Sequence, residues 1–141
     1  MDHIVYLDKQ SNELQNLIDG SKDIILRGAT GRKLPYGRCN VGDNLYFVNN
    51  NGEGFVKAKA IILDVEFSNQ LSKEESEKIV DSLQDRTKLH TKALKRFRGK
   101  RYLSIIKVAS VEEVEPFQFD KSNFSNMDDW LPVGEINSIK K

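Results

Sequence analysis

The chain has 141 residues, of which 38% are apolar and 30% are charged, and its formal net charge is +1. This length and composition are typical of a globular protein that can bury a core without a disulfide or metal staple, and they exclude a disordered chain. We expect one domain over residues 1–141, in which residues 120–141 form a polar, partly docked C-terminal tail.

Apolar runs are too short for a membrane span of roughly 20 residues, and the first ten residues lack the features of a signal peptide. These observations predict a cytoplasmic location and no membrane partner. Cys39 is the single cysteine and is expected to be a buried or half-buried structural thiol rather than a nucleophile. His3 and His90 have no partner at metal-ligand spacing, so both are expected to be surface or structural groups. No metal or cofactor is predicted.

The first third of the chain predicts a strand, a short helix, a second strand and a long loop. Side-chain character alternates enough over residues 3–7 to predict a strand. Ser11 is expected to cap a brief helix that ends at a left-handed Gly20. The β-branched run over residues 22–27 favours another strand. Residues 28–44 hold four glycines and a proline within 17 residues, which predicts an irregular basic loop.

The remaining elements are a hairpin, two helices and closing strands. Residues 44–49 and 55–67 flank a turn and predict an antiparallel hairpin with exposed lysines. Residues 71–85 open with Ser72 and Glu75 at capping-box spacing, and residues 87–99 carry a second amphipathic pattern that ends at Gly99. Residues 101–119 supply one or two strands that bend near residues 109–113. Apolar side chains at four later positions are expected to dock on the body: Phe124, Trp130, Leu131 and Val133.

The order of these elements indicates the fold class. Five or six short mixed strands without regular βαβ alternation do not form a doubly wound sheet. The sequence therefore predicts an α+β protein with a mixed barrel-like sheet and flanking helices.

Charge is segregated along the chain. Residues 86–107 contain nine basic residues and no acidic one, whereas residues 112–135 contain seven acids and one lysine. Such a division predicts one face that attracts anions and an acidic segment that shields another surface. Alternatively, the acidic segment binds a protein partner through the region around Asp128, Asp129 and Trp130.

A partial motif gives a more specific expectation. Gly20, Lys22 and Arg27 match most of the pattern Gly-x-Lys-x-x-Glu-x-Arg. Val41-Gly42-Asp43 precedes a predicted strand, and a Gly-Asp pair followed by a strand usually comes after that pattern. In these residues the chain resembles the ASCH family of PUA-like β-barrels. The resemblance implies an ASCH-type barrel with a cleft that binds RNA or a nucleotide. The chain departs from the pattern at Ile25, where the family has Glu.

A basic and aromatic set is the candidate for ligand binding in such a cleft. Tyr36 stands between cations, as base stacking beside a phosphate contact requires, although packing over Pro35 is an alternative. The full candidate set is Lys22, Arg27, Arg32, Lys33, Tyr36, Arg38, Arg96, Arg98, Lys100 and Arg101.

Each cation also has a purely structural alternative. Lys22 can place its charge on the carbonyl end of the preceding helix, and Arg27 can pair internally with Asp43 or Asp64. Arg32, Lys33 and Arg38 can belong to a solvated loop, and residues 92–101 can be a charged helix face. Strand alternation would send Lys22 and Arg27 to opposite sides unless a bulge intervenes.

One branch of the ASCH family hydrolyses acylated cytidine with a lysine, a threonine and a glutamate. Lys22 matches that lysine, but Ile25 stands where the resemblance implies the threonine and has no hydroxyl. An amide hydrolase needs an activated nucleophile, and Thr30 or Ser21 could supply one only if the loop folds back. Hydrolysis of N4-acetylcytidine is therefore the alternative to RNA binding, and a protein-interaction module is the third possibility.

Overall fold

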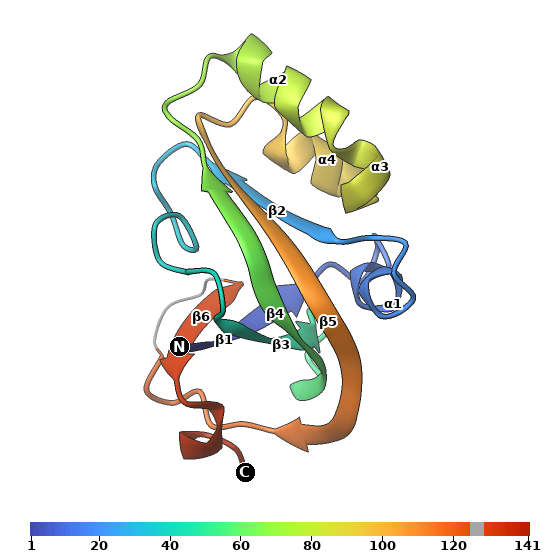
Figure 1. Ribbon diagram of the computed structural model, residues 1–141, viewed down its shortest axis with the longest axis vertical. Coiled ribbons are helices and arrows are strands. Elements are labelled where there is room, and N and C mark those ends of the chain that lie inside the picture. Colours follow the sequence, from blue (N-terminus) through green and yellow to red (C-terminus); the bar gives the residue numbers. More distant parts are fainter. Residues whose placement is uncertain (125–128) are drawn as a thin grey trace.

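The computed structural model describes residues 1–124 and 129–141. Its centre is a six-stranded sheet in the order β2-β5-β4-β3-β1-β6, curled into a half-barrel with the helices of residues 73–97 at one end (Figure 1). Among the strands of the described residues, only β1 and β3 pair in parallel. The strands are β1 (Asp2–Leu7), β2 (Ile24–Ala29), β3 (Asn44–Asn49), β4 (Phe55–Phe67), β5 (Tyr102–Gln118) and β6 (Trp130–Gly134). This confirms the predicted α+β class and mixed sheet.

The long central strands follow the predicted alternation. In β4, Val56, Ala58 and Ala60 are buried, whereas the intervening lysines are only partly buried. β3 and β4 pair as the predicted antiparallel hairpin, and β5 pairs with both β4 and β2. Residues 102–118 form one strand, with Ser110 at a φ of 55° beside register shifts against β4. The predicted bend is therefore a bulge within a strand, which lets a long strand curl.

The helices differ from prediction at their ends. They are α1 (Glu13–Ile18), α2 (Lys73–Ser82), α3 (Gln84–Thr87), α4 (Thr91–Phe97) and the 3₁₀ turn η1 (Ile136–Ser138). The capping box of Ser72 and Glu75 is present at α2. The expected helix over residues 87–99 is shorter and begins only at Thr91, because Lys88 adopts a left-handed φ of 50° between α3 and α4.

Ser11 does not cap α1, contrary to expectation. Asn12 precedes the helix with a φ of 51° and makes no side-chain cap bond. The Ser11 hydroxyl instead donates to Asp8 at 2.6 Å and accepts from the His90 backbone at 2.8 Å, so it joins α1 to the start of α4. The left-handed Gly20, at a φ of 82°, ends this segment as predicted.

Three apolar clusters fill the molecule. The largest lies inside the curled sheet beneath α1, a second packs α4 and α2 on β2 and β5, and a third joins β6 and η1 to β1. Trp130 is fully buried, Leu131 and Val133 are nearly so, and Phe124 packs on the third cluster, so these predicted docking residues are confirmed. Among the described residues, no helix combines the length and hydropathy that crossing a bilayer demands.

Candidate functional site: an arginine-lined cleft

A buried ion cluster lies where β2 begins. Lys22 places Nζ 3.0 Å from Oε2 of Glu13, and Arg27 places a terminal nitrogen 3.7 Å from Oε1 of the same carboxylate. Lys22 and Glu13 are each 1% exposed and Arg27 is 6% exposed. Glu13 comes from α1, so this carboxylate faces Arg27 although Ile25 has replaced the glutamate of the motif.

Both cations reach Glu13 because only one of them belongs to the strand. β2 begins at Ile24, so Lys22 lies in the segment after Gly20, where strand alternation does not apply. The expectation of opposite-facing side chains therefore does not hold, and no bulge in β2 is needed. Lys22 also donates to the Thr87 carbonyl of α3, and it lines neither cavity of the cleft described below.

The electrostatics of the cluster reflect its burial. Burial raises the pKa of Glu13, but nearby Arg27 and Lys22 more than offset this, so its pKa is lowered overall. Burial lowers the pKa of Lys22, and the Glu13 carboxylate opposes that shift. Desolvation of this kind is tolerable because each charge faces an opposite charge.

Arg27 pairs internally, but not with the carboxylates that the sequence suggested. Its terminal nitrogens donate to the carbonyls of Leu26 at 2.9 Å and Tyr6 at 3.0 Å. Because β2 and β1 are not neighbours in the sheet, the Tyr6 bond ties the two sides of the curl together. Asp43 instead accepts from His3, and Asp64 lies opposite Lys107 in the β4–β5 register.

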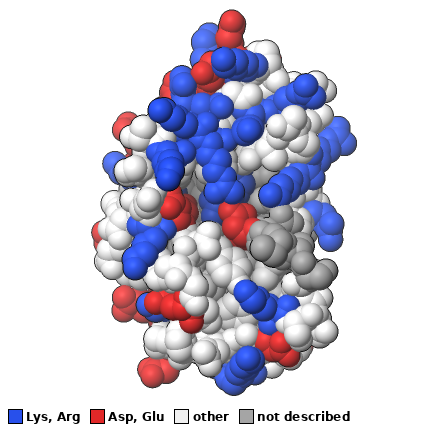
Figure 2. Space-filling model, turned by 180° about the vertical axis from the view of Figure 1, so that it is seen from behind, with Lys and Arg blue, Asp and Glu red and all other residues white. Residues whose placement is uncertain are grey.

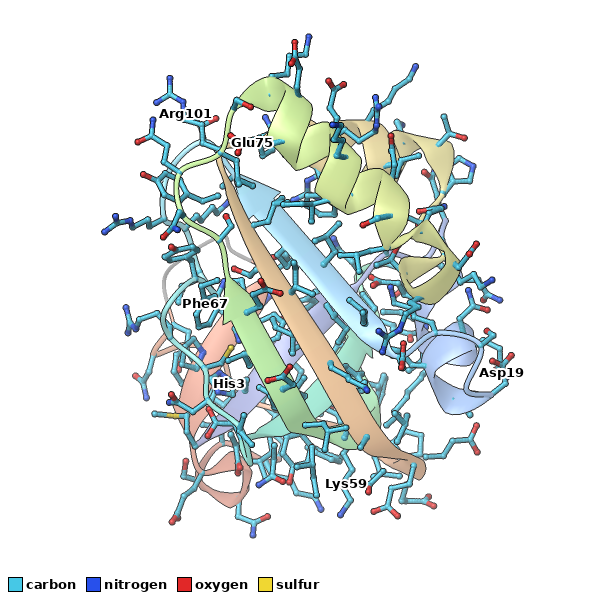
Figure 3. All side chains as sticks on the ribbon, turned by 45° about the horizontal axis from the view of Figure 1, so that its top comes forward. His3, Asp19, Lys59, Phe67, Glu75 and Arg101 are labelled. Carbon is cyan, nitrogen blue, oxygen red and sulfur yellow. The ribbon has the colours of Figure 1, made fainter. Side chains whose placement is uncertain are left out.

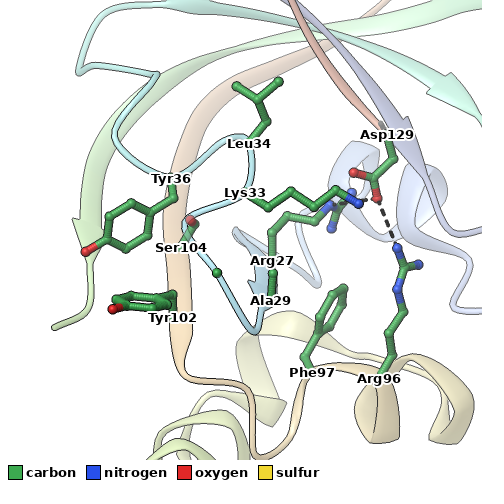
Figure 4. A pocket seen from close by; sticks show the side chains of 12 residues that line it. Arg27, Ala29, Lys33, Leu34, Tyr36, Arg96, Phe97, Tyr102, Ser104 and Asp129 are labelled. Atoms are coloured by element: carbon green, nitrogen blue, oxygen red, sulfur yellow. Dashed lines mark ion pairs between the residues drawn. The ribbon is translucent and has the colours of Figure 1, made fainter. Parts of the chain in front are cut away.

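Two adjoining cavities open beside Arg27. The larger encloses about 250 Å³ and the smaller about 20 Å³, and both are lined by Arg27, Arg96, Phe97 and Asp129. Tyr6, Glu13 and Leu89 also line the larger cavity, whereas Lys33, Tyr36 and Tyr102 also line the smaller one (Figure 4). Together they form one cleft between β2, α4 and Asp129, the residue before β6.

At one end of this cleft, an arginine of the loop after β2 lies near two tyrosine rings. The Arg32 guanidinium lies 5.4 Å from the ring centre of Tyr102 and 6.0 Å from that of Tyr36. Tyr36 also packs on Phe67 and donates its hydroxyl to the Ser68 carbonyl. Tyr36 is thus half-buried against aromatic side chains, and Pro35 beside it is buried. Arg38 is exposed and lines neither cavity.

The basic residues of and after α4 have separate roles. Arg96 is exposed and lines both cavities. Arg98 pairs with Asp81 at 2.8 Å and Glu77 at 3.1 Å, so it joins α4 to α2. Lys100 is half-buried near Gly28, and the exposed Arg101 accepts a backbone hydrogen bond from Leu71, just before α2 (Figure 3). Of these four, only Arg96 lines the cleft.

Charge on the molecular surface is uneven. Lys and Arg side chains crowd the upper half of the face shown in Figure 2, whereas charges of both signs are scattered over the lower half. One face of the molecule therefore carries a basic area.

The remaining chemical groups have structural partners. His3 is fully buried, with Nε2 2.8 Å from Asp43 and Nδ1 3.1 Å from the Trp130 indole nitrogen. His90 precedes α4 and accepts from the Lys92 backbone. Both are therefore structural, as expected. Cys39 is buried, and burial raises the pKa of its thiol to about 12, as expected for an unreactive thiol. No three His, Cys, Asp or Glu side chains form a candidate metal site within residues 1–124 and 129–141.

The acidic segment lies partly in the cleft. Asp129 contacts Arg27 and Arg96, and Trp130 is enclosed in the core. Asp128, which the sequence analysis grouped with them, lies outside the described residues. Trp130 is therefore not available as a surface anchor for a protein partner.

Sequence reasoning missed Glu13 and the placement of Asp129. Glu13 had a usable signal, since it precedes Leu17 by four residues and so shares the buried face of α1. Asp129 had none, because it reaches Arg27 from about a hundred residues further along the chain.

Neither a protein-family model nor a curated protein matches the chain. Among solved structures, the chain is similar to an ASCH protein from Zymomonas mobilis, at 10% identity and a TM-score of 0.67, over 97% of this chain and 91% of that one. Two single-substitution variants of that protein give TM-scores of 0.63 and 0.64, each at 12% identity, over 97% of this chain and 93% and 91% of theirs. This likeness confirms the ASCH-type fold.

Proposed function

We propose that the chain binds RNA, or a nucleotide-sized part of it, in the cleft between β2, α4 and the segment before β6. The observation that carries this proposal is the composition of the cleft, in which Arg27, Arg96 and Lys33 lie among Phe97, Tyr36 and Tyr102. Cations that meet phosphates and rings that stack on bases are the two elements of single-strand recognition.

Two further features support RNA as the ligand. The chain shares the fold of an ASCH protein, and the resemblance of its sequence to the ASCH family implies RNA binding. One face of the molecule carries a basic area (Figure 2), which would attract a polyanion. Lys22 is left out of the proposed contacts because it is 1% exposed and already bonded to Glu13 and Thr87.

The test is the binding of fluorescein-labelled RNA, measured by fluorescence anisotropy. A single-stranded 12-mer of mixed sequence and a hairpin of equal length would be titrated at several salt concentrations. For the single strand, we expect log K to fall with log salt by about 0.7 for each phosphate contacted. Absence of salt-sensitive binding to either RNA at low ionic strength would overturn the proposal.

Exposed cleft residues provide the variants. Arg96→Gln and Lys33→Gln should each weaken binding and lower the salt slope by about 0.7, because each removes about one phosphate contact. Arg86→Gln is the matched control, since Arg86 is an exposed arginine paired with Asp23 and lines neither cavity. Equal effects of all three substitutions would show that net charge, and not the cleft, determines binding.

The other two functions remain predictions of the sequence. Incubation with N4-acetylcytidine and detection of cytidine would test the hydrolase, whose matching Lys22 lies outside both cavities. No described contact favours it over RNA binding.

A further inference from the structure

The Asp129 carboxylate lies between the two arginines that the cavities share. Its Oδ2 atom is 3.4 Å from Nε of Arg27 and 3.8 Å from a terminal nitrogen of Arg96. Figure 4 shows the two guanidinium groups reaching this carboxylate from β2 and from α4. One negative group thus holds the position where two cations from separate elements meet.

The carboxylate is a loose fit for this position. Charge-assisted hydrogen bonds between guanidinium and carboxylate groups are about 2.7–2.9 Å long, and both contacts exceed that length. Nε of Arg27 is buried and has no hydrogen-bond partner, although the terminal nitrogens of Arg27 are bonded to the carbonyls of Leu26 and Tyr6. The Nε–H group of Arg27 therefore has no acceptor beside the cleft. An unpaired buried donor is unfavourable in free energy, and a ligand with a better-placed acceptor would remove that penalty.

The fold fixes the place of Asp129. Its carbonyl accepts a hydrogen bond from the Tyr6 backbone at 2.9 Å, which continues the pairing of β6 with β1. The next residue, Trp130, is fully buried and bonded to His3. The carboxylate is therefore presented to the arginines by an anchored backbone, while its own side chain is 22% exposed.

We propose that Arg27 and Arg96 form the phosphate subsite of the cleft, and that Asp129 occupies this subsite as an internal stand-in until a phosphate of the RNA displaces it. This inference rests on the proposed function. A tetrahedral phosphate offers several oxygens and can accept from Nε of Arg27 and from Arg96 together, which one carboxylate oxygen does not achieve at 3.4 and 3.8 Å. The adjoining cavity of about 250 Å³, lined by Tyr6, Leu89 and Phe97, then receives the attached nucleoside.

Removing the Asp129 charge should strengthen binding. Asp129→Asn keeps the shape of the side chain but leaves the arginines without this competing anion. We expect the 12-mer RNA to bind about three- to tenfold more tightly at low salt, the effect of one partly screened charge a few ångströms away. The gain should shrink as salt rises.

Asp23→Asn is the matched control. Asp23 is also a partly exposed carboxylate paired with an arginine, Arg86, and it lines neither cavity. Its removal changes the net charge by the same amount, so we expect little change in RNA affinity. An equal gain in both variants would overturn the subsite, because net charge alone would explain it.

The second arm introduces Arg96→Gln. If the two arginines form one subsite, the increase in RNA affinity caused by Asp129→Asn should be about half as large or less when Arg96→Gln is also present. An undiminished gain would overturn the assignment of Arg96. RNA binding by the unaltered protein, with no gain in Asp129→Asn, would refute the stand-in alone and leave the proposed function intact. Failure of both the unaltered protein and Asp129→Asn to bind would refute the proposed function and the subsite together.

Discussion

A buried carboxylate can remain ionised only if the protein supplies the interactions that water would otherwise give. Glu13 accepts from the Asp8 backbone at 3.0 Å and faces both Lys22 and Arg27. These contacts join α1 to the start of β2, which forms one wall of the cleft. The cluster therefore acts on function by holding Arg27 in place rather than by contacting a ligand.

Substitution of Glu13 tests this role. Glu13→Gln leaves the buried Lys22 without its counter-charge, and we expect a loss of about 3–5 kcal/mol in the free energy of unfolding. Urea unfolding followed by the fluorescence of Trp130, the single and fully buried tryptophan, would measure it. Asp23→Asn, which breaks a largely exposed pair, should change stability little. A loss of similar size in both variants would contradict the role of burial.

His3 gives stability a dependence on pH. Its Nδ1 atom must be unprotonated to accept from the Trp130 indole, and Nε2 then donates to Asp43. Burial lowers the pKa of His3 below 6.5, although Asp43 opposes the shift. The unfolded chain thus takes up a proton near pH 6.5 that the folded chain does not.

Stability should therefore be full above about pH 6.5 and decline as the pH falls below it, by at most about 1.4 kcal/mol per pH unit. Urea unfolding at pH 7.5 and 5.5 would measure the difference. His3→Gln, which does not titrate, should be less stable at pH 7.5 but show a smaller difference between the two values. The same pH dependence in His3→Gln would assign the effect to another group.

At the level of elements, local sequence signals predicted most of what the structure contains. The capping box places the start of α2, Gly20 ends the α1 segment, and alternation defines β4, because each depends on residues a few positions apart. The same reasoning failed at Lys88, whose left-handed backbone separates α3 from α4. It also failed at Ser11, whose hydroxyl bonds to His90, 79 residues away, instead of capping α1.

The α2 capping box supports the helical layer that carries the basic residues. Ser72→Ala removes the side-chain acceptor for the Glu75 backbone, and we expect a loss of about 1 kcal/mol in the free energy of unfolding. Thermal unfolding followed by circular dichroism would detect it. Ser21→Ala is the control, because Ser21 is exposed and its hydroxyl lies 3.4 Å from the Asn16 carbonyl, which is long for a hydrogen bond. An unchanged melting temperature in Ser72→Ala would argue against the cap.

For the whole molecule, the curl of the sheet brings together residues from both ends of the chain. Arg27 of β2 bonds to Tyr6 of β1, and Asp129 enters the cleft from the segment before β6. The C-terminal residues are correspondingly part of the core. Ile136 is 6% exposed and Ile139 is 9% exposed, and both pack with Leu131 and Val133.

Removal of these two side chains should destabilise the whole fold. The double variant Ile136→Ala with Ile139→Ala is expected to lose about 4 kcal/mol, because each substitution leaves a gap in the cluster that joins β6 to β1. Urea unfolding by Trp130 fluorescence would measure the loss in one cooperative transition. Lys141→Ala, which alters an exposed side chain, is the control. An unaffected double variant would mean that this segment contributes little to stability.

The sequence alone determined the α+β class, the order of most elements, the segregation of charge and the resemblance to ASCH-type barrels. These features depend on composition, on periodicity and on short-range capping, all of which can be read within a few residues. Only the tertiary structure decided which cations face the cleft. Lys22 is drawn into the core by Glu13, Arg98 is held by Asp81, and Arg96 remains at the cleft beside Asp129. Which charged groups pair depends on the distances between them in the folded protein, and the sequence pattern does not contain those distances.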